Sequence, residues 1–327
     1  MVDQYKTLDS GAVHAWCIER ASQLLNIHGS MGMIVPLSLS STQRMEVVQS
    51  ILENARSCWY SNYSWRPAKL FETVNRALTI FVAMGGAKQH TWSTGYRKWT
   101  SDNRDGLFDI VSYLQVDRKR PAWWIPKCSF AIEALILNKM LTKELSPIRY
   151  FITEAGVGKV FYRVGGGLYW KVFTDFAPRF VLNGKEGHSS RETWIDVRTK
   201  EDAKRIVGVL SSNLFWWWYT VTSNVRDLNP SDILNFRLPE TIMTDNSILE
   251  VSEQYQNDIC QNSTMLVRLQ KKTGKTETQS FTISKSKPII DKIDELLAKH
   301  YGFTEEELDF IINYDIKYRM GDELNGG

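Results

Sequence analysis

The sequence predicts an α/β protein that begins with half of an α/β sheet and continues with a mixed domain and a helical tail. Three observations lead to this prediction. Residues 1–85 combine amphipathic helical patterns with short, strongly apolar strand patterns. Residues 86–239 are aromatic, polar and interrupted by glycine and proline, whereas residues 240–327 are largely helical in pattern. We therefore predict three segments with boundaries near residues 85 and 239.

The first segment alternates helix and strand signals. Residues 12–27 place apolar side chains at helical spacing on one face, namely Val13, Trp16, Cys17, Ala21, Leu24 and Leu25. Residues 31–36, "MGMIVP", are too short and too apolar for anything but a buried strand. A helix over residues 43–55, capped by Ser41 or Thr42, and strands over residues 57–64 and 76–84 follow.

These elements form only part of a sheet. A parallel sheet needs a crossover of a dozen or more residues between strands, and only a few residues precede the first predicted helix. We therefore expect either that another chain completes the sheet or that the sequence is a fragment of a longer one.

The second segment reads as a mixed α+β domain, and the third as helical. The expected elements are a short helix over 105–116, a loop over 118–127, a helix over 129–145, a hairpin over 159–184 around Gly165–Gly167, a helix over 200–223 and a strand over 233–239. The tail is expected to hold a long helix over 246–270, a flexible polar break over 274–279 and two helices over 286–314. In those last helices Pro288 suits a helix start, Gly302 a helix end, and Thr304 with Glu307 a capping box.

The amino-acid composition limits which classes of protein this chain can belong to. A chain of 327 residues with 43% hydrophobic and 24% charged residues is typical of a globular protein of two or three domains. It lacks any run of about 18 apolar residues and any basic start before an apolar core, so we expect a cytoplasmic protein without a membrane partner. Its four cysteines form no CxxC pair and its five histidines lack metal-ligand spacing, so we expect reduced, buried thiols and no metal site.

Charge is unevenly distributed along the chain. Residues 1–239 carry 30 Lys and Arg against 21 Asp and Glu, while residues 240–327 carry 10 against 16. A basic body that is interleaved with aromatic residues suits a polyanion partner, and an ordinary solvated surface has the same composition. The cluster "FWWWY" at 215–219 is expected to be helix packing, because three adjacent tryptophans point in three directions.

Catalytic and cofactor motifs are missing. In "TEAGVGKV", residues 153–160, Thr153 and Val160 stand where a phosphate loop needs Gly and Ser or Thr. "VGGGLYW" lacks the spacing of a dinucleotide-binding loop, and neither a GxSxG elbow nor an HExxH zinc helix occurs. We therefore predict no catalytic, cofactor-binding or metal residue in this chain.

Several long stretches resemble the C-terminal portion of adenine-specific DNA methyltransferases of type II restriction-modification systems, including those fused to a nuclease. Residues 5–41, which contain "HGSMGMIVPLSLSS", and residues 70–83, "LFETVNRALTIFVA", are similar to the part of that family that follows the catalytic loop. The regions 120–141, 161–180 and 210–239 resemble its target-recognition region, and 287–321 its closing helices.

The resemblance implies a fold, a cofactor and a partner. It makes "GMIVP" the fifth strand of a seven-stranded Rossmann-like sheet whose absent strands carry the methyl donor S-adenosylmethionine. The family's cofactor loop and its catalytic Asn-Pro-Pro-Tyr loop have no counterpart here, because Asn229-Pro230 continues as Ser-Asp and lies in the wrong region. Without them we expect neither a bound cofactor nor methyl transfer by this chain alone. Phe71 in "LFETV" matches the aromatic residue that contacts the flipped adenine, and a plain core role is the alternative.

The expected function is that of the target-recognition part of a site-specific adenine-N6 methyltransferase, which binds double-stranded DNA and works with a separate N-terminal half. A split subunit and a truncated gene both fit this expectation. The alternatives are a DNA-binding module without catalysis and an inert remnant. The residues predicted to contact DNA are Lys127, Tyr162, Arg163, Lys171, Arg179 and Arg226.

Overall fold

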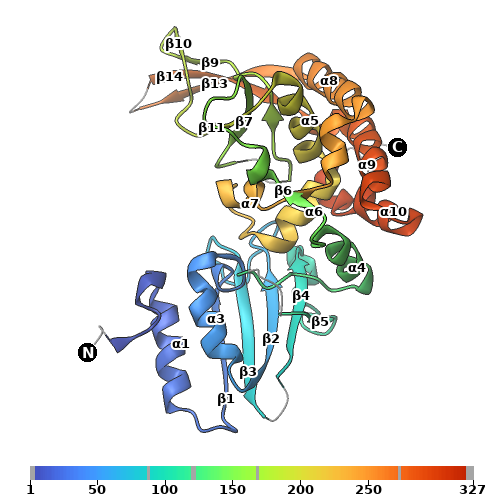
Figure 1. Cartoon of the computed structure of the whole chain (residues 1–327). Helices are drawn as coiled ribbons and strands as arrows, with labels where there is room; N and C mark the ends of the chain where they lie inside the picture. The colour runs from blue at the N-terminus through green and yellow to red at the C-terminus, as the bar shows by residue number, and fades with distance from the viewer. Residues whose placement is uncertain (1–3, 87–88, 119–122, 167–168, 272–273, 322–327) are drawn as a thin grey trace. The chain divides into compact units, whose positions relative to one another are not determined.

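The computed structural model describes residues 4–86, 89–118, 123–166, 169–271 and 274–321 (Figure 1). The chain forms two compact units. Unit 1 comprises Met1–Leu135 and Tyr219–Arg226, and unit 2 comprises Ile136–Trp218 and Asp227–Gly327. The division falls inside two helices, α4 (Ala131–Met140) and α6 (Asn213–Thr222). The roles predicted for the three segments, namely a partial methyltransferase sheet, a target-recognition domain and a helical tail, stay predictions.

Unit 1 is built on a mixed sheet of five strands in the order β1-β3-β2-β4-β5. The strands are β1 (Ser30–Pro36), β2 (Arg56–Tyr63), β3 (Leu78–Gly85), β4 (Thr91–Arg97) and β5 (Leu114–Val116). Strand β3 runs antiparallel to both β1 and β2, and β2 runs parallel to β4. The three predicted strands are thus present, and β1, β2 and β4 all point the same way. The prediction that residues 31–36 form a buried strand was wrong, because β1 lies at the edge of the sheet and Ile34 is 50% exposed.

Helices cover one face of this sheet (Figure 1). They are α1 (Val13–Leu24), α2 (Ser38–Ser41) and α3 (Glu46–Glu53), with 3₁₀ turns at Leu8–Ser10 and Gln43–Met45. A further 3₁₀ turn, Ser101–Asn103, follows β4. The core between helices and sheet includes Ile18, Val48, Leu52, Tyr60 and Phe81, none of which exposes any surface. At about 25 cal/mol per Å² of apolar surface, side chains of this size each contribute roughly 1.5–3 kcal/mol by burial.

Helix α1 packs through only part of the predicted face. Trp16 packs against the core as predicted, whereas Val13 is 67% and Leu24 69% exposed. Ala15 and Ile18, which lie outside the predicted face, are fully buried. The exposed side of α1 therefore carries Val13 and Leu24 together with the charged Arg20.

The other face of the sheet is covered only in part. A second core of Tyr63, Leu70, Leu78, Trp99 and Leu107 lies toward the carboxyl end of β2. Further along, Ile34 of β1 and the β3 residues Val82 and Met84 remain exposed. The register pairs Ile34 with Ile80, so all three side chains point to the same face.

Unit 2 combines three small sheets with helices. Its strands are β6 (Ser146–Pro147), β7 (Gly158–Arg163), β8 (Phe173–Thr174), β9 (Phe180–Leu182), β10 (Lys185–Gly187), β11 (Glu192–Val197), β12 (Arg237–Leu238), β13 (Ser263–Gln270) and β14 (Gly274–Phe281), in the sheets β10-β9-β14-β13, β11-β7-β8 and β12-β6. Its helices are α5 (Lys200–Ser211), α7 (Pro230–Leu234), α8 (Asn246–Gln261), α9 (Lys287–Tyr301), α10 (Glu305–Asn313) and α11 (Ile316–Arg319), with 3₁₀ turns at Ile148–Phe151, Glu240–Thr244 and Ile283–Ser286.

Some local signals in unit 2 were read correctly. Gly302 ends α9 in the left-handed conformation, and Thr304 with Glu307 forms the capping box of α10. The aromatic cluster at 215–219 is buried as expected, and Phe215 meets Phe173 and Phe236 edge to face.

Other predictions for the chain were wrong. The helix predicted over 200–223 breaks at Ser212, because the buried carboxylate of Asp294 accepts hydrogen bonds from the amides of Asn213 and Leu214 and starts α6 there. The helix predicted over 246–270 ends at Gln261, and β13 pairs antiparallel with β14, so the flexible break predicted over 274–279 is a strand. The short helix predicted over 105–116 is a series of turns leading into β5.

Candidate functional site

The carboxyl edge of the unit 1 sheet is the best candidate site. Because β1, β2 and β4 run in the same direction, their carboxyl ends share one edge, which is where ligands bind in open α/β sheets. The loop over residues 64–77 follows β2 at this edge. Its backbone is anchored, since the amide of Ser64 donates to the carbonyl of Arg97 at 2.8 Å and that of Ala68 to Trp99 at 3.1 Å.

This anchored loop presents Phe71 to solvent. The Phe71 side chain is 45% exposed, although the preceding Leu70 is buried. Arg104 donates to the carbonyls of Lys69 and Leu70, and the Phe71 carbonyl accepts from the amide of Val74 at 3.1 Å. An exposed ring on a fixed backbone can contact a planar ligand without the cost of ordering the loop.

Cations and aromatic rings lie together at this edge. The guanidinium of Arg66 lies 4.2 Å from the ring centroid of Trp65, and the ammonium of Lys98 lies 5.8 Å from that of Tyr96. The Nη1 atom of Arg97 is buried without a hydrogen-bond partner within the described chain. Positive groups at the same sheet edge as the exposed Phe71 ring suit an anionic ligand that carries a flat base.

A buried polar cluster supports the same edge from below. Asn62 exposes no surface; its Nδ2 donates to the Thr94 carbonyl at 3.0 Å, and its Oδ1 accepts from the hydroxyls of Ser40 and Thr79. Because these groups satisfy one another, the cluster fixes the strand ends and offers no reactive group.

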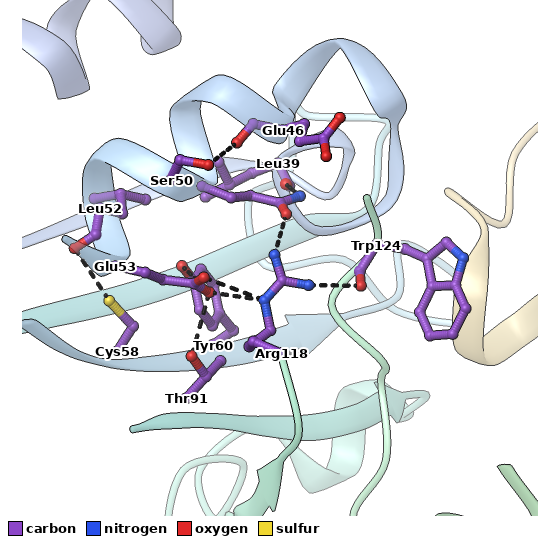
Figure 2. Close-up of polar contacts among 11 residues, drawn as sticks. Leu39, Glu46, Ser50, Leu52, Glu53, Cys58, Tyr60, Thr91, Arg118 and Trp124 are labelled. Atoms are coloured by element: carbon purple, nitrogen blue, oxygen red, sulfur yellow. Dashed lines mark hydrogen bonds and ion pairs between the residues drawn. The ribbon is translucent and has the colours of Figure 1, made fainter. Parts of the chain in front are cut away.

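The network in Figure 2 is also structural. Arg118 donates to both carboxylate oxygens of Glu53, to the Trp124 carbonyl at 2.9 Å and to Gln49 at 2.6 Å, which ties α3 to the segment after β5. Burial raises the pKa of the nearby Cys58 thiol to about 12, with the Glu53 charge as a second cause. A thiol with that pKa stays protonated at neutral pH and is a poor nucleophile.

Lys127 does not lie on a DNA-accessible surface. It exposes 0% of its surface, and its ammonium donates to the carbonyls of Val221 and Ser223 at 2.8 Å each and to the Ser41 hydroxyl at 3.2 Å. The prediction of a DNA contact rested on its position in a basic loop. The structure instead uses this cation to join three segments of unit 1.

Two predicted contacts in unit 2 are also buried. Tyr162 faces the core of the unit, and burial raises its pKa. The ammonium of Lys171 donates to the Gly166 carbonyl at 3.0 Å, and burial lowers its pKa to about 8. Neither side chain is placed to contact a DNA phosphate, because alternation along β7 turns Tyr162 inward and the ammonium of buried Lys171 is held by a backbone carbonyl.

The remaining predicted contacts are accessible. Arg179 is exposed and pairs with Glu186 at 3.3 Å, and Arg226 is exposed in unit 1. Arg163 is partly exposed on β7. Sequence reasoning missed the exposed Trp194 and Arg191 beside it and Arg268 on β13. The alternation of Glu192, Trp194 and Asp196 with β-branched residues is typical of a strand, and it could have indicated β11 and the exposed side of Trp194.

The described residues contain no group of three or more His, Cys, Asp or Glu side chains arranged to hold a metal ion. In the same part of the chain, no helix has both the length and the apolar character needed to cross a membrane. Comparison with models of known protein families and with curated proteins gave no match to this chain.

Proposed function

We propose that this chain is the DNA-binding, target-recognition part of a site-specific adenine-N6 DNA methyltransferase of a restriction-modification system. In this proposal an N-terminal half, as a separate chain or as a preceding segment, supplies S-adenosylmethionine and the catalytic loop. The observation that carries the proposal is the incomplete sheet of unit 1.

The edge of that sheet supports a missing partner. Within the described residues β1 pairs with β3 and leaves its other side unpaired. The unpaired side of this seven-residue edge strand presents backbone donors and acceptors that favour pairing with a further strand. Sheets of α/β proteins are normally covered on both faces, and here helices cover one.

Apolar surface lies on both sides of the open edge. Ile34, Val82 and Met84 are exposed on the uncovered face, and Val13 and Leu24 are exposed on α1. Apolar patches of this kind mark interaction surfaces in soluble proteins. Further strands and helices placed beside β1 would cover all of them.

Phe71 supports the adenine part of the proposal. The exocyclic amino group of adenine is a poor nucleophile because its lone pair is delocalised into the ring, so the base must be flipped out and held precisely against the catalytic loop. By resemblance, Phe71 contacts one side of the flipped base. Its exposure on an anchored loop at the carboxyl edge suits this role.

The test is transfer of tritiated methyl groups from S-adenosylmethionine to duplex DNA of mixed sequence. The purified chain is assayed alone and with an N-terminal methyltransferase half that carries an Asn-Pro-Pro-Tyr loop, encoded beside it. We expect incorporation only with both parts. Incorporation by the chain alone refutes the missing half, and no incorporation with both parts refutes the methyltransferase role.

Two variants with matched controls sharpen the assay. Val82→Lys places a charge on the uncovered face and should lower transfer about tenfold or more at limiting concentrations, because burial of an unpaired charge is costly. Val47→Lys, equally exposed on α3, is its control. Phe71→Ala should lower kcat, whereas Phe130→Ala, another exposed phenylalanine of unit 1, should not.

A further inference from the structure

The sheet β11-β7-β8 of unit 2 has one covered and one open face. Val160 and Tyr162 of β7 are buried on the side on which α5 packs. The alternate residues Lys159, Phe161 and Arg163 point to the opposite face. In the register these three lie opposite Asp196, Trp194 and Glu192 of β11.

Positive charge gathers at one end of this open face. At the other end, the ammonium of Lys159 is paired with Asp196 at 2.5 Å. Arg163 has a buried Nε atom without a hydrogen-bond partner in the described structure. The carbonyl of Arg191 accepts from the amide of Val164 at 3.0 Å, which places Arg191 directly beside the end of β7.

Arg268 completes this group from strand β13. Burial lowers the pKa of Arg163, and the positive charges of Arg191 and Arg268 each lower it further, so each of these two arginines lies near enough to act on Arg163. Glu192 is the acidic group that acts on Arg163 in the opposite direction. Three cations that face one carboxylate leave an excess positive charge that a bound anion would stabilise.

An aromatic pair adjoins the three arginines. Trp194 is 46% exposed, and its ring centroid lies 5.8 Å from that of Phe161. The Lys159 ammonium lies 5.0 Å from the Trp194 ring. A fixed, half-exposed ring beside donors that fit phosphate oxygens bidentately suits a nucleic-acid backbone better than a simple anion.

We infer that Arg163, Arg191 and Arg268 form a binding site for backbone phosphates of duplex DNA, with Trp194 in contact with the adjoining sugar. This inference rests on the proposed function and assigns part of its DNA contact to the open face of the β11-β7-β8 sheet. Phosphate contacts fix the position of a protein on DNA and carry no base information. The arginine site should therefore bind matched and unmatched sequences alike.

The test is the salt dependence of duplex DNA binding by the full chain, measured by fluorescence anisotropy between 50 and 200 mM salt. Each lost phosphate contact lowers the slope of log Kd against log salt by about 0.9. Over this fourfold range of salt, the rise in Kd then becomes about 3.5-fold smaller. Between 50 and 200 mM salt, the affinity of the double variant Arg191→Gln with Arg268→Gln should therefore fall about 12-fold less than that of the wild-type chain. The control is Lys292→Gln with Lys299→Gln, which removes the same charge from two exposed positions on α9.

The outcomes separate this inference from the proposed function. A reduced slope in the arginine variant with an unchanged slope in the lysine control supports the site, whether or not methyl transfer is found. Equal slopes in wild type and arginine variant overturn the site and leave the proposed function standing. Absence of duplex binding by the wild-type chain, or tighter binding of single-stranded RNA of equal length, overturns both DNA assignments.

Discussion

Replacing Lys127 by Met tests whether this cation stabilises unit 1 or contacts DNA. The two side chains have similar length, so Lys127→Met mainly removes the ammonium and its bonds to Val221, Ser223 and Ser41. The Val221 carbonyl keeps a second bond from the Lys127 amide at 3.1 Å, whereas the Ser223 carbonyl loses its bond to the ammonium. One buried acceptor left without a donor costs about 1–3 kcal/mol, whereas the other lost bonds are offset because the variant has no ammonium to dehydrate on folding.

We therefore expect Lys127→Met to lower the stability of unit 1 by about 1–3 kcal/mol. Hydrogen exchange on peptides from β2 and β3 measures this directly, because it reports the opening free energy of each region separately in a chain of two units. The salt slope of DNA binding should stay at the wild-type value. An unchanged exchange rate together with a slope lowered by about 0.9 would refute this reasoning and restore Lys127 as a phosphate contact.

Three further predictions concern titration, thiol reactivity and backbone packing. Burial lowers the Lys171 pKa from 10.5 to about 8, so the unfolded state binds more protons between these two pH values. The unfolding free energy should therefore rise with pH across that window, by up to about 3 kcal/mol. Urea unfolding at several pH values measures this rise, which the variant Lys171→Met should lack. Native protein should react rapidly with a thiol reagent at two exposed cysteines and slowly at two buried ones, which mass spectrometry of labelled peptides resolves as Cys17 and Cys260 against Cys58 and Cys128. A Cβ atom at Gly158 would lie 1.9 Å from the Thr199 carbonyl oxygen, so Gly158→Ala should lower the melting temperature by the equivalent of about 1–3 kcal/mol, whereas Gly187→Ala, which meets no atom, should not.

Local chemistry was readable from the sequence. The end of α9 and the start of α10 follow from Gly302, Thr304 and Glu307, because a left-handed cap and a capping box each need only residues within one turn. The strands of unit 1 followed from their apolar composition. In both cases the determining contacts are close in sequence.

Features that depend on residues far apart in the sequence could not be predicted. The break between α5 and α6 depends on Asp294, which lies about eighty residues along the chain from the amides it caps. The burial of Lys127 depends on carbonyls of Val221 and Ser223, which sequence reasoning had no means of placing beside it. Likewise Arg268 reaches the neighbourhood of Arg163 through a hairpin that had been read as helix.

The wrong prediction for α1 bears on the proposed function. Helical periodicity in a sequence records which face is buried in the functional protein, and it marked a stripe that includes Val13, Cys17 and Leu24. In this chain these three side chains are exposed, whereas Trp16 of the same predicted face packs against the core together with Ala15 and Ile18. A helix with apolar side chains on both faces is typical of one that is buried all round. In the proposed function, one further layer beside the unpaired edge of β1 would cover both the exposed residues of α1 and the open sheet edge.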